Sequence, residues 1–186
     1  MFLLGNVVTN TGPEEVTPIY NYAEVLIRRA ELSEVDVIKE IIKEAYEPVR
    51  RKLSRLPGAL QEGLDKIARH VQMGHIYVAI VGNQVVGTMR VMLRGRTGVI
   101  ARLAVRNSFR GRRIGTVMMD YAEETLRQKN ATCIEIEVYG AVEEQVNFYK
   151  RRGYVEYGRT IREGEEIILM RRDLCEPETD ETEEES

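Results

Sequence analysis

The sequence predicts a single α/β (α+β) domain in which about six or seven strands form a mixed, mostly antiparallel central sheet flanked by four helices. Two observations support this prediction. The chain has 186 residues, the length of one domain, and its 43% hydrophobic and 31% charged residues are the balance of an ordered globular protein. Stretches with helical periodicity also alternate with short β-rich runs, an order that places helices against a sheet.

The first predicted elements are a strand and two helices. Residues 24–30 form a short apolar and basic run that suits a strand, and Ser33 follows as the expected N-cap of a helix. Apolar residues then recur at the spacing of a one-faced helix as far as Val49, after which basic residues favour a helix C-terminus. Pro57-Gly58 breaks the chain, and residues 60–71 repeat the helical pattern.

From His75 onward the pattern is that of strands. Residues 76–81 and 85–93 are joined by a Gly82-Asn83-Gln84 hairpin signal. Residues 99–105 are apolar except for Arg102, which predicts a strand near the middle of the sheet. The remaining predicted elements are a helix at 113–129, a strand at 132–138, a helix at 141–152 and strands at 154–159 and 165–171.

The domain boundaries follow from composition. Residues 1–22 are rich in Gly, Asn and Pro without periodicity and are expected to form an extended arm, leaving 23–175 as the folded domain. Residues 176–186 hold seven of the 30 acidic side chains and no Lys or Arg, so we expect an acidic disordered tail. The rest of the chain carries 27 basic and 23 acidic side chains, a net charge of +4. An alternative role for the tail is an anion mimic that visits a basic site.

Several classes of protein do not fit this composition. There is no apolar run long enough to span a membrane and no signal-like start, so a cytoplasmic protein without a membrane partner is expected. Cys133 and Cys175 are too few for a disulfide framework and lack neighbours at metal-ligand spacing, so no metal is expected.

The most informative segment is the strand, loop and helix start of residues 102–126. Arginines and Gly111 precede an amphipathic helix that begins at about Arg113 and contains Gly115 in its first turn. A helix N-terminus presents free N–H groups and a partial positive charge, glycine permits close approach, and Arg110, Arg112 and Arg113 add positive charge. These properties predict a site for a pyrophosphate. The spacing of Gly111 and Gly115 fits neither a P-loop nor a dinucleotide fingerprint.

These residues resemble the acetyl-CoA motif of the GCN5-related N-acetyltransferase (GNAT) superfamily, Arg/Gln-x-x-Gly-x-Gly/Ala after the fourth strand. Residues 110–115 match its first and last positions, with Arg113 in place of the usual middle glycine. The resemblance spans roughly residues 24–173 and implies a GNAT-like acyl-CoA N-acyltransferase fold with acetyl-CoA as co-substrate. It implies the following cofactor-binding residues: Leu103, Ala104, Val105, Arg110, Gly111, Arg112, Arg113, Ile114, Gly115 and Thr116.

A second match at residues 147–154 resembles the family's Phe-Tyr-x-x-x-Gly-Phe/Tyr signature. It implies that Tyr149 is the general acid that protonates the departing CoA thiolate; helical spacing alone would equally suit a core aromatic. A general base is less clearly marked, because Ala101 occupies the position where many relatives carry a glutamate and Val142 the position of the usual asparagine. Glu137 is the next candidate base, with an exposed strand glutamate as the alternative.

The resulting functional prediction is transfer of an acetyl group from acetyl-CoA to a primary amine by direct attack in a ternary complex. One alternative is a non-catalytic acyl-CoA-binding or sensor module. Another is nucleic-acid binding through the basic stripe at 102–113, although no nucleic-acid partner is expected because aromatic interleaving is missing. Cys133 as an acylated nucleophile is disfavoured, since no His flanks it.

The acceptor remains open between a small-molecule and a protein amine, and a homodimer is a further possibility. The resemblance places acceptor contacts on the first two helices, their loop and the last hairpin. The candidates there are Tyr46, Arg50, Arg55, His70, Arg159 and Arg162.

Overall fold

The structure, a computed structural model, describes residues 20–22 and 24–174. Within this part of the chain, eight strands form one sheet in the order β1-β2-β3-β4-β5-β6-β8-β7. Only β5 and β6 are parallel; every other neighbouring pair is antiparallel. The predicted fold class is therefore confirmed. The predicted arm and tail lie outside the described residues, except that Tyr20–Tyr22 at the end of the arm forms β1 and adds a strand to the predicted number.

The strands on the first side of the sheet are joined in sequence order. Their bounds are β1 (Tyr20–Tyr22), β2 (Val25–Arg29), β3 (Ile76–Val81), β4 (Gln84–Arg94) and β5 (Thr97–Val105). On the other side lie β6 (Cys133–Tyr139), β7 (Val155–Arg162) and β8 (Glu165–Asp173). As predicted, β5 is a central strand, and none of its residues is fully exposed.

Five α-helices and two short 3-10 helices cover the described sheet. They are η1 (Leu32–Glu34), α1 (Val35–Arg50), α2 (Gly58–Gln61), α3 (Leu64–Gln72), η2 (Asn107–Phe109), α4 (Ile114–Gln128) and α5 (Glu143–Arg151). Two sequence predictions are wrong here. Ser33 is not an N-cap but lies inside η1, where the Glu34 carboxylate instead accepts a hydrogen bond from the Glu31 N–H at 2.8 Å. The single helix at 60–71 is two helices, interrupted at Glu62-Gly63.

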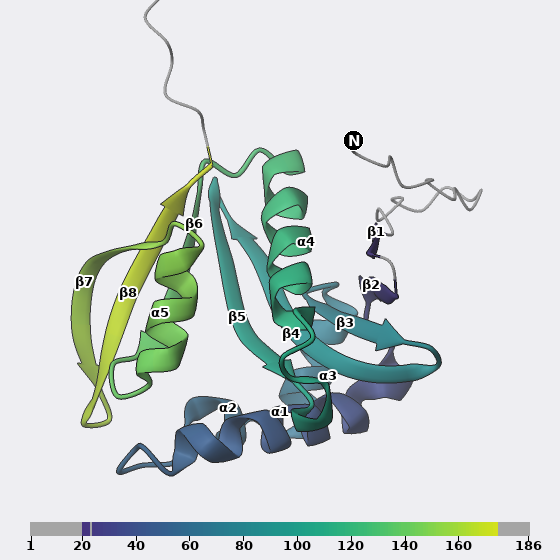
Figure 1. Cartoon of the computed structure of the whole chain (residues 1–186), viewed down its shortest axis with the longest axis horizontal. Coiled ribbons are helices and arrows are strands. Elements are labelled where there is room, and N and C mark those ends of the chain that lie inside the picture. Colours follow the sequence, from purple (N-terminus) through teal and green to yellow (C-terminus); the bar gives the residue numbers. More distant parts are fainter. Residues whose placement is uncertain (1–19, 23, 175–186) are drawn as a thin grey trace, which may run out of the picture.

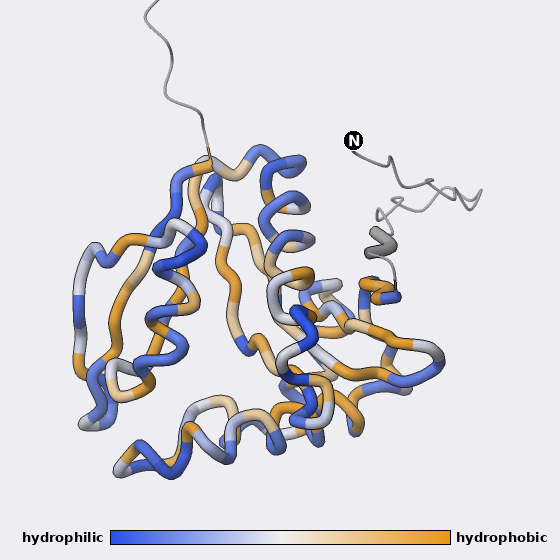
Figure 2. Tube along the Cα trace, in the orientation of Figure 1, coloured by the Kyte–Doolittle hydropathy of each residue, from blue (hydrophilic) through white to orange (hydrophobic). Residues whose placement is uncertain are grey.

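The helices form one layer on each face of the sheet (Figure 1). Helix α4 contributes Met118, Tyr121 and Leu126 to one core, which also receives Tyr77 of β3. Helices α1 and α3 pack on the opposite face with Val78 of β3. Alternate residues of β3 thus face opposite cores, as the pleat of a strand requires. Figure 2 shows the result, apolar segments along the strands and hydrophilic segments along the outer sides of the helices.

Within residues 20–22 and 24–174, no helix combines the length and the apolar character that a membrane-spanning helix needs.

Candidate active site

The site lies where the two parallel strands separate. Strands β5 and β6 are paired only at Thr97–Val99 with Cys133–Glu135, although β5 continues to Val105 and β6 to Tyr139. Beyond the pairing, the two strands diverge and leave an opening in the sheet (Figure 1). The β6-facing backbone groups of the second half of β5 therefore have no strand partner in the described sheet and can bind a ligand.

A β-bulge shapes β5 at this opening. Arg90 of β4 pairs with Ala101, but Thr88 pairs with Ala104, so β5 carries one extra residue. Arg102 lies in the bulge with a φ of 57°, a left-handed conformation that is uncommon for a residue with a side chain. The bulge turns the backbone at the position where the strands diverge. It lies next to residues 103–105, which the resemblance implies are cofactor-binding residues.

The loop after β5 ends at the N-terminus of α4. Gly111 has a φ of 74°, and Arg113, the N-cap, has a φ of 61°. The first helical bond is donated by the N–H of Val117 to the carbonyl of Arg113. The N–H groups of residues 114–116 precede this bond, as expected for a first turn, and they point out of the helix end. These are the groups that the sequence predicts to bind an anion.

The left-handed conformation of Arg113 explains the glycine that the family motif has at this position. A side chain in this region costs of order 1 kcal/mol, a cost that glycine does not carry. We therefore expect Arg113→Gly to raise the free energy of unfolding by about 1 kcal/mol in urea denaturation. Arg112→Gly is the matched control, because Arg112 has no positive φ, and it should leave stability unchanged or lower it. Equal effects of the two substitutions would contradict this account.

The three arginines of the predicted anion site differ in what they contact. Arg110 donates a hydrogen bond to the carbonyl of Ala45 on α1 at 3.0 Å, so it anchors the loop. Arg112 lies over the ring of Phe109, 5.0 Å from the ring centre. Arg113 is exposed. The three guanidinium groups therefore do not form one cluster at the helix N-terminus.

A hollow of about 430 Å³ lies in front of the helix N-terminus. A Cβ added to Gly115 would point into open space, with nothing within 4 Å, so this glycine leaves room at the helix end. The hollow brings together most of the predicted cofactor-binding residues. Its lining is Val105, Phe109, Arg110, Gly111, Arg113, Ile114, Gly115, Thr116 and Phe148. Leu103 lines the next cavity instead, whereas Ala104 is buried with its side chain in the core of α1 and α3.

That next cavity, of about 200 Å³, contains Tyr149 and lies between β5 and α5. Phe148 lines both hollows, which places them side by side. Tyr149 packs edge-on against Phe148 and Tyr154, with ring centres 5.1 Å and 5.7 Å away. Burial, together with the neighbouring Tyr46, raises the pKa of the Tyr149 phenol, so it stays protonated at neutral pH. A protonated phenol facing a cavity has the form that a general acid requires.

Glu137 lies in the same cavity, but its carboxylate is already engaged. Arg162 of β7 donates two hydrogen bonds to it, at 2.6 Å and 3.0 Å. These bonds lower the pKa of Glu137, with further contributions from the charges of Arg162 and Arg102. A carboxylate held in this way is a weak base. Val142, at the position of the usual asparagine, is buried and offers no polar group.

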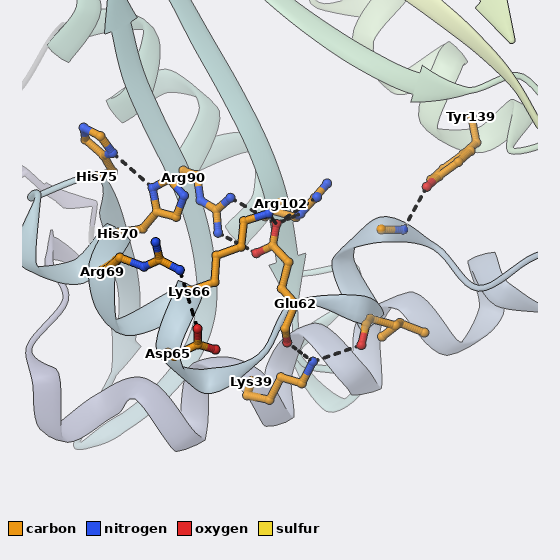
Figure 3. Close-up of polar contacts among 12 residues, drawn as sticks. Lys39, Glu62, Asp65, Lys66, Arg69, His70, His75, Arg90, Arg102 and Tyr139 are labelled. Atoms are coloured by element: carbon orange, nitrogen blue, oxygen red, sulfur yellow. Dashed lines mark hydrogen bonds and ion pairs between the residues drawn. The ribbon is translucent and has the colours of Figure 1, made fainter. Parts of the chain in front are cut away.

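Glu62 is the site residue that sequence reasoning missed. It is 5% exposed and occupies the break between α2 and α3. Arg90 donates to its carboxylate at 2.7 Å and 3.2 Å, Arg102 at 2.9 Å and 3.2 Å, and the Lys66 ammonium lies 3.3 Å away (Figure 3). Burial alone would raise the pKa of Glu62, but the two arginines outweigh it and lower the pKa to about 2. The Glu62 carboxylate thus holds the bulge residue Arg102 against α3.

A larger cleft of about 480 Å³ opens beside this cluster. It lies between the α1–α2 loop, the start of α3, the end of β6 and the β7–β8 hairpin, and Arg102 and Glu137 line both this cleft and the Tyr149 cavity. Residues of different walls are hydrogen-bonded to one another: the Ser54 N–H with Glu165 at 2.6 Å and the Gly58 N–H with the Tyr139 hydroxyl at 3.2 Å. Beside the cleft, Lys52 contacts Glu144 at 2.6 Å.

The predicted acceptor residues are divided by the structure. Arg55 and Arg162 line the large cleft, and Tyr46 lines the Tyr149 cavity. Arg50 faces a separate hollow on the outside of the α1–α2 loop, and Arg159 is paired with Glu156 and Glu166 on the exposed face of β7. His70 contacts His75 through their Nδ1 atoms at 3.1 Å, and burial followed by the charge of Arg90 lowers its pKa to about 4.

Cys133 is buried and lies 3.7 Å from the Thr97 hydroxyl, at the closed end of the β5–β6 pair. Cys175 lies outside the described residues. Among the described residues, no cluster of three or more His, Cys, Asp or Glu side chains is arranged to hold a metal ion.

The splayed parallel pair, the bulge and the open helix N-terminus thus lie together along β5 and the loop that follows it. The profile of the acetyltransferase (GNAT) family matches residues 36–154, and the chain belongs to this family. No curated protein matches it in sequence.

Solved structures share the fold at low identity. PaiA N-acetyltransferase from Thermoplasma acidophilum, in complex with coenzyme A, is 12% identical with a TM-score of 0.71, covering 80% of this chain and 98% of its own. The yncA protein from Salmonella typhimurium, with its cofactor acetyl-CoA, is 12% identical with a TM-score of 0.67, covering 86% and 99%. The ribosomal-protein-S18-alanine N-acetyltransferase from Escherichia coli is 13% identical with a TM-score of 0.66, covering 84% and 97%.

Proposed function

We propose that the chain transfers an acetyl group from acetyl-CoA to a primary amine by direct attack in a ternary complex. The pyrophosphate of the cofactor binds the N–H groups at the N-terminus of α4, beside Gly111 and Gly115. The pantetheine arm runs along residues 103–105 of β5. It takes the place of a neighbouring strand by hydrogen bonding to the backbone groups of β5 that face β6. The observation that supports the proposal is that the hollow at the N-terminus of α4 and the Tyr149 cavity lie next to each other, with Phe148 lining both.

The chemical step follows from this placement. The neutral amine attacks the thioester carbonyl carbon, and the carbon–sulfur bond breaks as the tetrahedral intermediate collapses. The departing thiolate takes the proton of the Tyr149 hydroxyl, which regains a proton from solvent. The amine loses its own proton to Glu137 or to water. Because the pKa of Glu137 is lowered, an amine that reaches the site already neutral reacts most readily.

Binding of the cofactor is tested by Gly115→Leu. The added side chain fills the space in front of the helix N-terminus and blocks the phosphate, so we expect the affinity for CoA in isothermal titration calorimetry to fall by roughly 100-fold, the loss of one or two charge-assisted hydrogen bonds. The fold should not suffer, because leucine is the better helix former by up to about 1 kcal/mol. Undiminished CoA affinity in a folded variant would refute the assigned phosphate site.

A second candidate function is a non-catalytic acyl-CoA-binding or sensor module. It is favoured because the Glu137 carboxylate, the candidate general base, is already hydrogen-bonded to Arg162. Release of free CoA thiol from acetyl-CoA in the presence of a broad panel of amines distinguishes the two. Tight CoA binding without amine-dependent thiol release would support the sensor.

A further inference from the structure

The acceptor amine has to approach through the large cleft, if the proposed transfer holds. The cleft meets the Tyr149 cavity at Arg102 and Glu137, the two residues that line both. The charge at this inner end decides which amine can enter and lose its proton there.

The carboxylates at the inner end of the cleft are already paired. Glu62 is buried between Arg90 and Arg102, and Glu137 is held by both donors of Arg162. Glu165 accepts hydrogen bonds from the N–H and hydroxyl of Ser54. Asp65 is paired with Arg69 at 3.5 Å. Glu163 lies farther out, exposed on the turn between β7 and β8. No unpaired carboxylate therefore lies at the inner end of the described cleft to attract and deprotonate an ammonium group.

The inner end also carries excess positive charge. The single carboxylate of Glu62 faces three cations, Arg90, Arg102 and Lys66, so the cluster has a net charge of +2 (Figure 3). A nearby positive charge lowers the pKa of an amine and disfavours its ammonium form. A lysine side chain, with an ordinary pKa of about 10.4, would arrive almost fully charged, whereas a peptide α-amine, with a pKa of about 7.7–8.0, is partly neutral at pH 7.

The same cluster has hydrogen-bond donors left for an anion. Arg102 uses only Nε and Nη2 on Glu62, and its side chain is 29% exposed. The Lys66 ammonium makes one ion pair and its side chain is 50% exposed. Both residues line the cleft. A carboxylate close to the acceptor amine can be held by these two groups while the amine lies near Glu137.

We infer that the acceptor is the α-amine of a peptide N-terminus with Asp or Glu among its first residues. This inference rests on the proposed transfer and specifies its substrate. A low-pKa α-amine suits a site without a free base, and the acidic side chain suits the donors of Arg102 and Lys66. Lysine side chains and polyamines carry positive charge to a positive wall and are selected against.

The experiment measures kcat/KM for the full chain with acetyl-CoA and four kinds of acceptor: a peptide that starts Ala-Glu, the same peptide with Ala-Gln, an N-terminally blocked peptide with one lysine, and free glutamate. We expect the Ala-Glu peptide to exceed the Ala-Gln peptide by at least roughly 10-fold, the value of one charged hydrogen bond. Lys66→Met should move this ratio toward 1. Lys43→Met is the matched control on α1, outside the described cavities, and should keep the ratio.

Equal rates with the two peptides, or a preference for the lysine peptide or for free glutamate, would overturn this inference and leave the transfer itself standing. An unchanged ratio in Lys66→Met would remove Lys66 from acceptor recognition and overturn the assigned contact. Absence of turnover with every acceptor, in a protein that binds CoA, would overturn the proposed transfer and this inference with it.

Discussion

Tyr149→Phe is expected to lower kcat by roughly 10²- to 10⁴-fold, the usual contribution of a general acid. The substitution removes only the hydroxyl, so the edge-on packing of this ring against Phe148 and Tyr154 is retained. Steady-state measurement of CoA release at saturating acetyl-CoA gives kcat, and calorimetry gives the affinity for CoA. Affinity should change little, because the pyrophosphate contacts lie at the N-terminus of α4.

The pH dependence adds a second check on Tyr149. Burial raises the pKa of this phenol above its ordinary value of 10, so the wild-type rate should not fall through ionisation of Tyr149 between pH 7 and 10. Tyr157→Phe is a suitable control for Tyr149→Phe. Tyr157 is exposed on β7 and lines neither the large cleft nor the Tyr149 cavity. A wild-type kcat in Tyr149→Phe would exclude the residue from proton transfer.

Glu62→Gln is expected to lower the free energy of unfolding by about 3–5 kcal/mol, because it leaves the guanidinium of Arg90 buried without a countercharge. Arg90 is only 6% exposed, so water cannot replace the lost carboxylate. Urea denaturation at pH 7 measures the loss. Glu137→Gln is the matched control: Glu137 also binds an arginine through both oxygens, but the pair is exposed, and its loss should cost less than about 1 kcal/mol.

The pH profile of stability identifies the same group. The pKa of Glu62 is about 2 in the folded protein and 4.5 as its ordinary value, so the stability that it contributes is complete above pH 4.5 and is lost as pH falls toward 2. The difference between wild type and Glu62→Gln should therefore shrink over this range. A constant difference from pH 7 to pH 2, or equal effects of Glu62→Gln and Glu137→Gln, would contradict the buried-pair interpretation.

The parts of the fold that the sequence predicted depend on local patterns. Alternation and helical periodicity located β3, β4, β5, α1 and α4, and the periodicity that starts at Ile114, after Gly111, located the N-terminus of α4. Glu62 was not predicted, because its role depends on partners 28 and 40 residues away in the sequence. A polar residue between two apolar helical stretches also has the pattern of an ordinary surface position. The bulge at Arg102 was not predicted either, because its backbone conformation is fixed by distant partners, β4 and Glu62.

The site, like the fold, could be predicted only where it depends on local sequence. The predicted phosphate-binding end comes from one continuous segment, so most of its residues lie together around the N-terminus of α4. The acceptor end combines the α1–α2 loop, α3, β6 and the β7–β8 hairpin, so only three-dimensional structure could show that Arg159 faces away and that Glu137 is bound to Arg162. The sequence alone therefore could not show that the candidate general base, Glu137, is held by an arginine.

The three-residue pairing of β5 with β6 is a short seam, the only strand pairing that joins β1–β5 to β6, β8 and β7 in the described sheet. At the seam, backbone hydrogen bonds are reinforced by the buried Glu123 of α4, which Arg152 and Arg172 bind at 2.9 Å and 2.7 Å. At the opposite end, the two groups of strands and their helices meet through exposed contacts such as Lys52 with Glu144, which salt screens. The two halves of the described sheet are therefore held by buried ion pairs at one end and by salt-sensitive surface contacts at the other.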